Sequence, residues 1–153
     1  MVGKINKRGF TLTELLVAMA IMGIMLSVAT LSYLKWKTKT NIENDIKKIY
    51  SILQKYRVRA FSEKESFTCS FSSDGKTFYV RDSGGNLEES LTLDEAFAFK
   101  SSNITIDSRG TFSGSAIKPS NTSAVPQYNC ISVDDTRIKL GQWNSGSNNC
   151  NVQ

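Results

Sequence analysis

Residues 15–34 read LLVAMAIMGIMLSVATLSYL, twenty consecutive positions without a charged side chain. An α-helix rises about 1.5 Å per residue, so as a helix this run is about 30 Å long, the thickness of a bilayer's hydrocarbon core. The preceding segment, MVGKINKRG, carries three basic residues and no acid. Because basic flanks tend to stay in the cytoplasm, the sequence predicts one membrane span with its amino end inside and its C-terminal part translocated.

The flanks of this run distinguish a secretory signal from an anchor. A secretory signal has a shorter apolar core and ends in a small-residue cleavage site, whereas this run continues into LKWKTKT at residues 34–40. Long basic side chains beside an aromatic one favour the membrane–water interface. We therefore expect an interfacial anchor at Lys35, Trp36, Lys37 and Lys39. On length and flanks alone, a plain single-span anchor remains an equal alternative.

One acidic residue at the start of the apolar run favours a more specific role. A carboxylate such as Glu14 is costly in a lipid-embedded helix unless it is paired. If the chain were cut between Gly9 and Phe10, the new α-amino group would lie one helical turn before Glu14. Glu14 could then neutralise the amino terminus of Phe10 on a neighbouring subunit and set the register between helices.

Residues 8–16, RGFTLTELL, resemble the processing motif of type IV prepilins and type II secretion pseudopilins. The resemblance implies that a prepilin peptidase cuts after Gly9 and methylates the amino group of Phe10, and that Glu14 serves docking into a filament. It also implies an inner-membrane assembly platform and other pilins as partners. The subunit would begin in the bacterial inner membrane and end in a pilus or pseudopilus. The span lacks the proline of many major pilins, which favours a less abundant subunit.

Helical periodicity continues beyond the span. Apolar residues recur at helical spacing with charged residues between them, at Ile42, Ile46, Ile49, Leu53, Tyr56 and Ala60. This pattern predicts one helix from about Thr11 to Phe61. We therefore expect a leader at 1–9, a long helix at 10–62 and a head domain at 63–153. The basic residues on the second half of the helix are interpreted as a solvated face.

The pattern changes to short alternating segments in the head. Residues 66–72 and 76–82 predict a hairpin around Ser73-Asp74-Gly75. Residues 91–99 are ambiguous between a strand and a helical turn. Further strands are expected at 103–107, 111–117, 128–133 and 137–140. The fold class is therefore α+β, a long N-terminal helix packed on a small antiparallel β-sandwich head.

The segments ITIDSRGTFSGSAI (104–117) and CISVDDTRIKLG (130–141) are similar to the C-terminal domain of the GspH/FimT family of minor pseudopilins and minor pilins. The resemblance implies a low-copy subunit near a filament tip. Some FimT-type minor pilins bind DNA through a Gly-Arg-x-Arg motif. The matching positions here are Thr136, Arg137, Ile138 and Lys139, which differ from it at two residues. Arg137 and Lys139 are thus candidate contacts to double-stranded DNA. Trp143 is a candidate for stacking on a base, although a tryptophan in a tail more often covers the edge of a domain.

The remaining chemistry argues against an enzyme. The chain has no histidine, and its three cysteines fit no C-x-x-C spacing, so we expect no metal site, no cofactor and no catalytic residue. Cys130 and Cys150 bracket a tail rich in small polar residues, and a disulfide between them would contribute about 3 kcal/mol. Cys69 is interpreted as a buried small hydrophobe. Two assignments stay open: a type IV pilus subunit, and a type II secretion pseudopilin.

Overall fold

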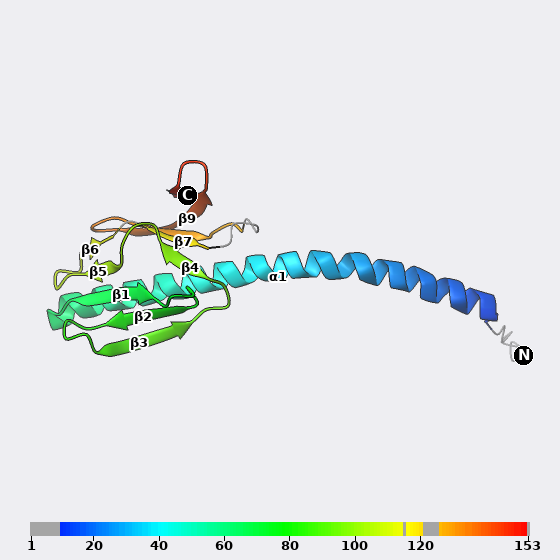
Figure 1. Ribbon diagram of the computed structural model, residues 1–153, viewed down its shortest axis with the longest axis horizontal. Coiled ribbons are helices and arrows are strands. Elements are labelled where there is room, and N and C mark those ends of the chain that lie inside the picture. Colours follow the sequence, from blue (N-terminus) through cyan, green and yellow to red (C-terminus); the bar gives the residue numbers. More distant parts are fainter. Residues whose placement is uncertain (1–9, 115, 121–125, 153) are drawn as a thin grey trace, which may run out of the picture. The chain divides into compact units, whose positions relative to one another are not determined.

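A computed structural model of the chain describes residues 10–114, 116–120 and 126–152, except for the side chains of residues 28, 29 and 31. The described residues contain one helix, α1, which runs from Leu12 to Glu63 (Figure 1). Contacts divide the chain into two units, Met1–Trp36 and Lys37–Gln153, and the division falls within α1. Each unit is described below by itself.

The Lys37–Gln153 unit contains two five-stranded antiparallel sheets. The first has the order β3-β2-β1-β5-β6, with bounds Leu87–Thr92, Thr77–Arg81, Phe67–Phe71, Ile104–Ile106 and Phe112–Ser113. The second has the order β10-β9-β8-β7-β4, with bounds Asn149–Val152, Ile138–Asn144, Cys130–Val133, Ala116–Pro119 and Phe97–Phe99. Together with α1 they form the α+β fold expected from the sequence.

The second half of α1 and both sheets share one hydrophobic core. All six apolar positions predicted on the helix are buried in it, from Ile42 to Ala60. The first sheet contributes Phe67 and Phe78, and the second contributes Ile117 and Ile131. Alternation explains this arrangement, because every second residue of a strand faces the helix. The hydrophobic stripe read from the sequence is therefore the surface on which the head is built.

A buried carboxylate on α1 fixes the connection between β3 and β4. Asp45 has 0% exposure, and its Oδ2 accepts hydrogen bonds from the backbone N–H groups of Asp94 (2.7 Å) and Glu95 (3.0 Å). Its Oδ1 pairs with Lys48 Nζ at 2.9 Å. That pairing raises the pKa of Lys48. Every oxygen of this carboxylate is thus satisfied, as burial requires.

The expected strand at residues 111–117 is wrong, because two strands of different sheets occupy this stretch. β6 ends at Ser113 and β7 begins at Ala116, and Gly114 between them has φ of 134°. A Cβ on Gly114 would lie 2.8 Å from Cγ1 of Ile104. The chain therefore changes sheet at a position where only glycine fits the backbone and the packing.

The C-terminal region also contains more strand than the sequence predicted. β9 extends to Asn144 rather than ending at 140, and β10 pairs with it in a segment expected to be an irregular tail. The ambiguous stretch 91–99 contains the end of β3 and all of β4. The hairpin at 66–82 is present as β1 and β2, with Thr68 opposite Arg81.

Candidate functional site

The amino end of α1 is closed by a capping box. Glu14 Oε2 accepts hydrogen bonds from the backbone N–H of Thr11 (2.9 Å) and from its hydroxyl (2.8 Å). The Thr11 hydroxyl in turn accepts from the N–H of Glu14 at 3.3 Å. This reciprocal arrangement satisfies N–H groups that have no partner within the helix. It explains why α1 begins at Leu12.

Thr11 is a residue of this site that our reading of the sequence missed. The signal was present, because a threonine followed three residues later by a glutamate and then an apolar run is the sequence signature of a capping box. Gly9, the residue before the expected cut, lies outside the described residues. Phe10 is 87% exposed.

The capped turn lies beside an apolar surface of the helix. A shallow hollow of about 430 Å³ is lined by Phe10, Thr13, Glu14, Val17, Ala18 and Ile21. These residues lie three and four positions apart, so they share one face of α1. The Glu14 carboxylate is thus the only charged group in the lining, next to side chains suited to pack against another apolar helix.

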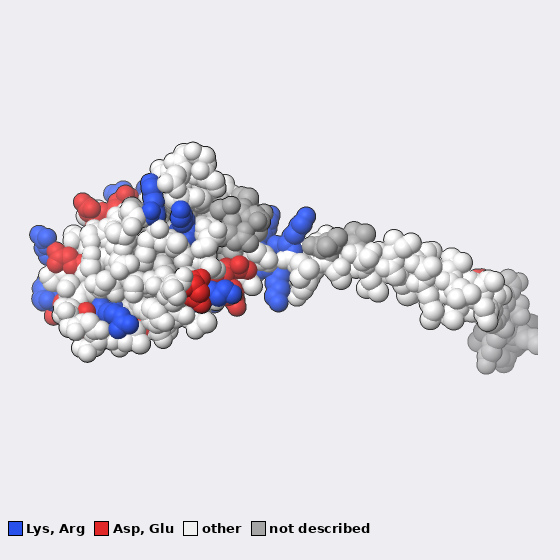
Figure 2. Space-filling model, viewed as in Figure 1, with Lys and Arg blue, Asp and Glu red and all other residues white. Residues whose placement is uncertain are grey.

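Within the described part of the Met1–Trp36 unit, no other segment packs against this half of α1. Large apolar side chains are exposed along it, among them Leu15, Val17, Met22, Ile24 and Leu26. The space-filling view shows few charged side chains along this half of α1, whereas they are frequent over the other unit (Figure 2). Among the described residues, α1 is the one helix long and apolar enough to cross a membrane.

Two hydroxyl groups within the apolar run donate hydrogen bonds to the helix itself. The Ser27 hydroxyl donates to the carbonyl of Ile24 at 2.7 Å, and the Thr30 hydroxyl donates to the carbonyl of Ser27 at 2.9 Å. Such bonds to the preceding turn would keep these two hydroxyl protons from lipid if this run crosses a membrane. A Cβ added to Gly23 would meet no atom of this chain within 4 Å. Packing within the chain therefore does not account for Gly23.

The residues expected to anchor the end of the span are exposed. Lys35, Lys37 and Lys39 are all solvent-accessible. The ring centroids of Tyr33 and Trp36 lie 6.0 Å apart, and both side chains are exposed. This composition suits the interface between lipid and water.

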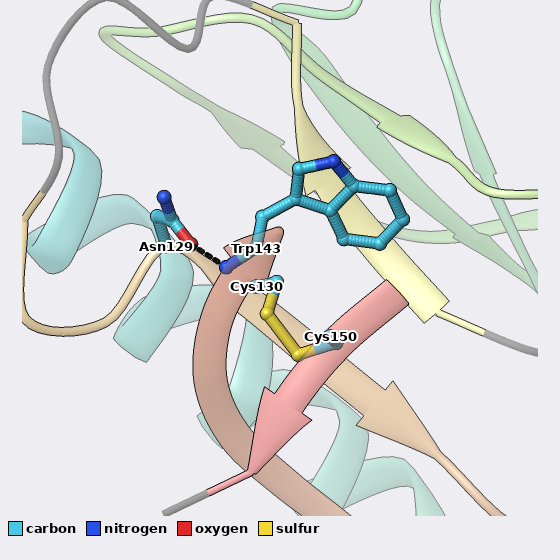
Figure 3. The surroundings of a disulfide bond; sticks show 4 residues. All are labelled: Asn129, Cys130, Trp143 and Cys150. Carbon is cyan, nitrogen blue, oxygen red and sulfur yellow. Dashed lines mark hydrogen bonds between the residues drawn. A yellow bond between two sulfur atoms is a disulfide. The ribbon is translucent and has the colours of Figure 1, made fainter. Parts of the chain in front are cut away.

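A disulfide joins Cys130 of β8 to Cys150 of β10, with an S–S distance of 2.00 Å (Figure 3). These are the two cysteines paired in our reading of the sequence. The bond belongs to a small buried cluster with Ala116 and Trp143 on the face of the second sheet opposite the main core. The backbone N–H of Trp143 donates to Asn129 Oδ1 at 2.6 Å. The cluster fastens the last strand to the sheet.

Trp143 is not placed to stack on a base. It is 9% exposed, packs in the disulfide cluster, and has Lys118 Nζ 5.5 Å from its ring. The structure thus gives this tryptophan the role of covering a sheet, and we withdraw it as a nucleic-acid contact. The other two candidates, Arg137 and Lys139, are exposed.

The strand expected at 137–140 would have contained both Arg137 and Lys139, but β9 begins at Ile138 and contains only Lys139. Arg137 lies in the turn before β9, where its N–H donates to the carbonyl of Asp134, and Lys139 lies within β9 opposite Ser132. Asp134 and Asp135 are exposed in the same turn. Two carboxylates therefore accompany the two basic groups.

Burial makes the third cysteine, Cys69, unreactive. Cys69 is free and fully buried in β1, and burial raises the pKa of its thiol to about 12. A thiol that stays protonated at neutral pH is a poor nucleophile and a poor metal ligand. Within the described part of the chain, no group of three or more His, Cys, Asp or Glu side chains could hold a metal ion.

Comparison with known proteins gives one match, at the amino end. Residues 4–30 match the family described as the prokaryotic N-terminal methylation motif. No curated protein and no solved structure matches the chain. The match covers the capped turn and most of the apolar run, and it does not extend to the head.

Proposed function

We propose that this chain is a type IV pilin-like filament subunit that is cut after Gly9, methylated at Phe10 and assembled through α1, because its residues 4–30 match the prokaryotic N-terminal methylation motif. The observation that carries the proposal is the first turn of α1, where Glu14 is the single charged residue between Leu12 and Leu34, beside exposed apolar side chains. Proteins with this motif are structural rather than catalytic, and the exposed helix fits a membrane-anchored pilin.

The proposed sequence of events follows from the chemistry of this turn. Before cleavage, the capping box satisfies the Glu14 carboxylate through Thr11. Cleavage before Phe10 creates a positive amino group one turn away. When a second helix packs alongside, the amine of one subunit neutralises Glu14 of the other, and both charges leave the lipid as a pair.

Features of the apolar run support close packing of helices in the filament. Gly23 and Ser27 lie four residues apart, which places two small residues on one helix face. Small residues at this spacing let two helices approach closely where no hydrophobic effect between them exists. The basic leader supports an inner-membrane precursor with its head outside the cytoplasm.

We further propose a low-copy, minor role near the tip of a type IV pilus. The absence of a proline in the span and the similarity of residues 104–117 and 130–141 to GspH/FimT heads support it. The alternative is a minor pseudopilin of a type II secretion system, which would use the same leader and helix. Loss of the gene should abolish pilus-dependent motility or DNA uptake in the first case, and secretion of exoproteins in the second.

Processing is the most direct test of the proposal. Mass spectrometry of membrane and filament fractions should find a mature chain that begins at Phe10 and carries one methyl group on its α-amine. Deletion of the prepilin peptidase should leave the leader in place and supplies the control. An intact leader in normal cells, or a cut beyond Ser27, would contradict the prepilin assignment.

The exposed Arg137 and Lys139 support a second, weaker role in binding duplex DNA. The full chain in a non-ionic detergent should bind DNA at low salt, and two phosphate contacts should make a fourfold rise in salt weaken binding about tenfold. The double variant Arg137→Ala/Lys139→Ala should lose this binding. The matched control is Lys76→Ala/Arg81→Ala, which removes two exposed basic groups elsewhere on the head. Equal DNA binding by the wild-type chain and by both double variants would contradict a role of Arg137 and Lys139 in binding DNA.

A further inference from the structure

A second hollow lies within the Lys37–Gln153 unit, beside the carboxyl end of α1, and helix packing in the membrane does not use it. Its volume is about 420 Å³, and it is formed by α1 together with the turn between β5 and β6. We call it the helix-end notch, and its lining residues are Gln54, Arg57, Val58, Phe61, Arg109 and Gly110.

Two large apolar side chains of the notch are exposed to solvent. Val58 is 68% exposed and Phe61 is 61% exposed, although the same helix buries its other face in the core. They lie three residues apart and so form one patch on the helix surface. Apolar side chains grouped in a concave surface, next to arginines, have the composition of the energetic centre of a protein interface.

The wall of the notch is held firmly in place. Arg57 Nε donates to the carbonyl of Gly110 at 3.1 Å, and the Arg57 guanidinium lies 5.7 Å from the ring centroid of Phe112. Gly110 has φ of 74°, and a Cβ there would lie 3.3 Å from the Arg57 carbonyl oxygen. The turn therefore presses directly on α1, so the notch is preformed.

The charges of the notch specify the chemistry of its partner. Its lining contains two guanidinium groups, those of Arg57 and Arg109, and no carboxylate. Arg109 pairs with Asp107 at 2.9 Å, but its side chain remains 80% exposed. A complementary segment would present acidic side chains next to a small apolar residue.

The chain itself carries such a segment. The connection between β3 and β4 contains Asp94 and Glu95, followed by Ala96. Asp94 is exposed and Glu95 is half-buried, and their backbone is held by the buried Asp45. We call residues 94–96 the acidic loop. Hydrogen bonds to α1 hold the backbone of the acidic loop, as they hold the turn that forms the wall of the notch.

Helical geometry separates these two surfaces in a way that favours stacking of copies. Asp45, which holds the acidic loop, and Val58 in the notch are thirteen residues apart on α1. At about 1.5 Å and 100° per residue, they lie about 20 Å apart along the axis and about 140° apart around it. Two different surfaces separated in this way along the helix suit a head-to-tail contact between parallel copies, each shifted by about 20 Å from the next.

From these observations we propose that the helix-end notch receives the acidic loop of a second copy of this chain, so that heads stack in a short run within the filament. This contact rests on the proposed filament role, which supplies the parallel alignment of the helices. Because the Glu14 pairing shifts two subunits by about one helical turn and this contact shifts them by about 20 Å, the two contacts join a subunit to different neighbours. A low-copy subunit of this kind would then occur as a short run of copies.

Cysteine cross-linking in cells that make the filament tests the contact. Val58→Cys and Glu95→Cys chains expressed together should give an oxidised dimer in the filament fraction. Either variant alone should not, because a head-to-tail contact brings position 58 to position 95. The native cysteines add no background, since Cys69 is buried and the other two are bonded. Val58→Cys with Ser90→Cys, an exposed position on β3, is the matched negative pair.

Charge exchange provides a second readout that does not depend on cross-linking. Arg109→Glu should lower incorporation into filaments about tenfold, because it places like charges opposite each other. Adding Glu95→Arg to the same chain should restore incorporation, since every copy then supplies both altered surfaces. If the partner were a different subunit, the double variant would be no better than the single one, and the proposal would be overturned.

The outcomes separate the two proposals. Wild-type chain in filaments without a 58–95 cross-link would overturn the stacking contact and leave the filament role intact. A cross-link by Val58→Cys alone, as strong as that of the mixed pair, would also overturn it. Wild-type chain that never enters filaments would overturn the filament role, and the stacking contact with it.

Discussion

Replacing Glu14 by alanine should leave the chain cut and methylated but stranded in the membrane, with its amount in filaments reduced about tenfold or more, as an unpaired charge in an apolar interface predicts. If the chain is cut between Gly9 and Phe10 as proposed, cleavage precedes the appearance of the pairing partner of Glu14, so processing should continue. Quantitative immunoblots of membrane and filament fractions, with mass spectrometry of the amino terminus, measure both effects.

A second variant separates the two roles of this side chain. Glu14→Gln keeps an oxygen that can accept the hydrogen bonds of Thr11, so the helix cap survives, but the charge is lost. If charge pairing drives assembly, Glu14→Gln should be as defective as Glu14→Ala. A glutamine variant that assembles normally would show that the cap alone matters, and the pairing with the Phe10 amine would be wrong.

Asp45→Ala should strongly destabilise the Lys37–Gln153 unit, with a loss of about 3–5 kcal/mol in the free energy of unfolding, because two hydrogen bonds to a buried carboxylate contribute about 1.5–3 kcal/mol each. Two backbone N–H groups, those of Asp94 and Glu95, would lose their acceptor, and Lys48 would lose its counter-charge. Urea unfolding of the full chain in detergent, followed by circular dichroism, measures the change.

Lys48→Ala is the matched control for this prediction. The side chain of Lys48 is 47% exposed, whereas that of Asp45 is fully buried, so removing Lys48 leaves the carboxylate with only its two backbone donors and should cost about 1–2 kcal/mol. Asp45→Asn keeps one oxygen acceptor and should fall between the two. Equal losses for Asp45→Ala and Lys48→Ala would mean that the acidic loop is held by other contacts.

The helix and its buried stripe were predictable from the sequence because both depend on local periodicity. Ile42 to Ala60 recur every three or four residues, and this spacing alone determines which face is apolar. The first hairpin was predictable for the same reason, since Ser73-Asp74-Gly75 separates two alternating segments. In each case the signal lies within a window of about ten residues.

The errors come from contacts between residues far apart in the chain. Nothing in the local pattern of 111–117 shows that the chain passes from one sheet to the other at Gly114, because the reason is the packing of Ile104. β10 was missed because its sequence, NCNV, has weak strand propensity. Its pairing with β9 and the bond to Cys130 create the strand. Trp143 was misread because its burial depends on that same cluster.

The inward hydrogen bonds of Ser27 and Thr30 bear on whether assembly can be reversed. Because these hydroxyls already donate to carbonyls of their own helix, moving α1 from lipid into a bundle of helices breaks no polar contact at either position. At these two side chains the transfer exchanges one set of apolar neighbours for another, with little change in free energy for the residues themselves. At Ser27 and Thr30, the proposed transfer of α1 between bilayer and filament would therefore cost no hydrogen bond in either direction.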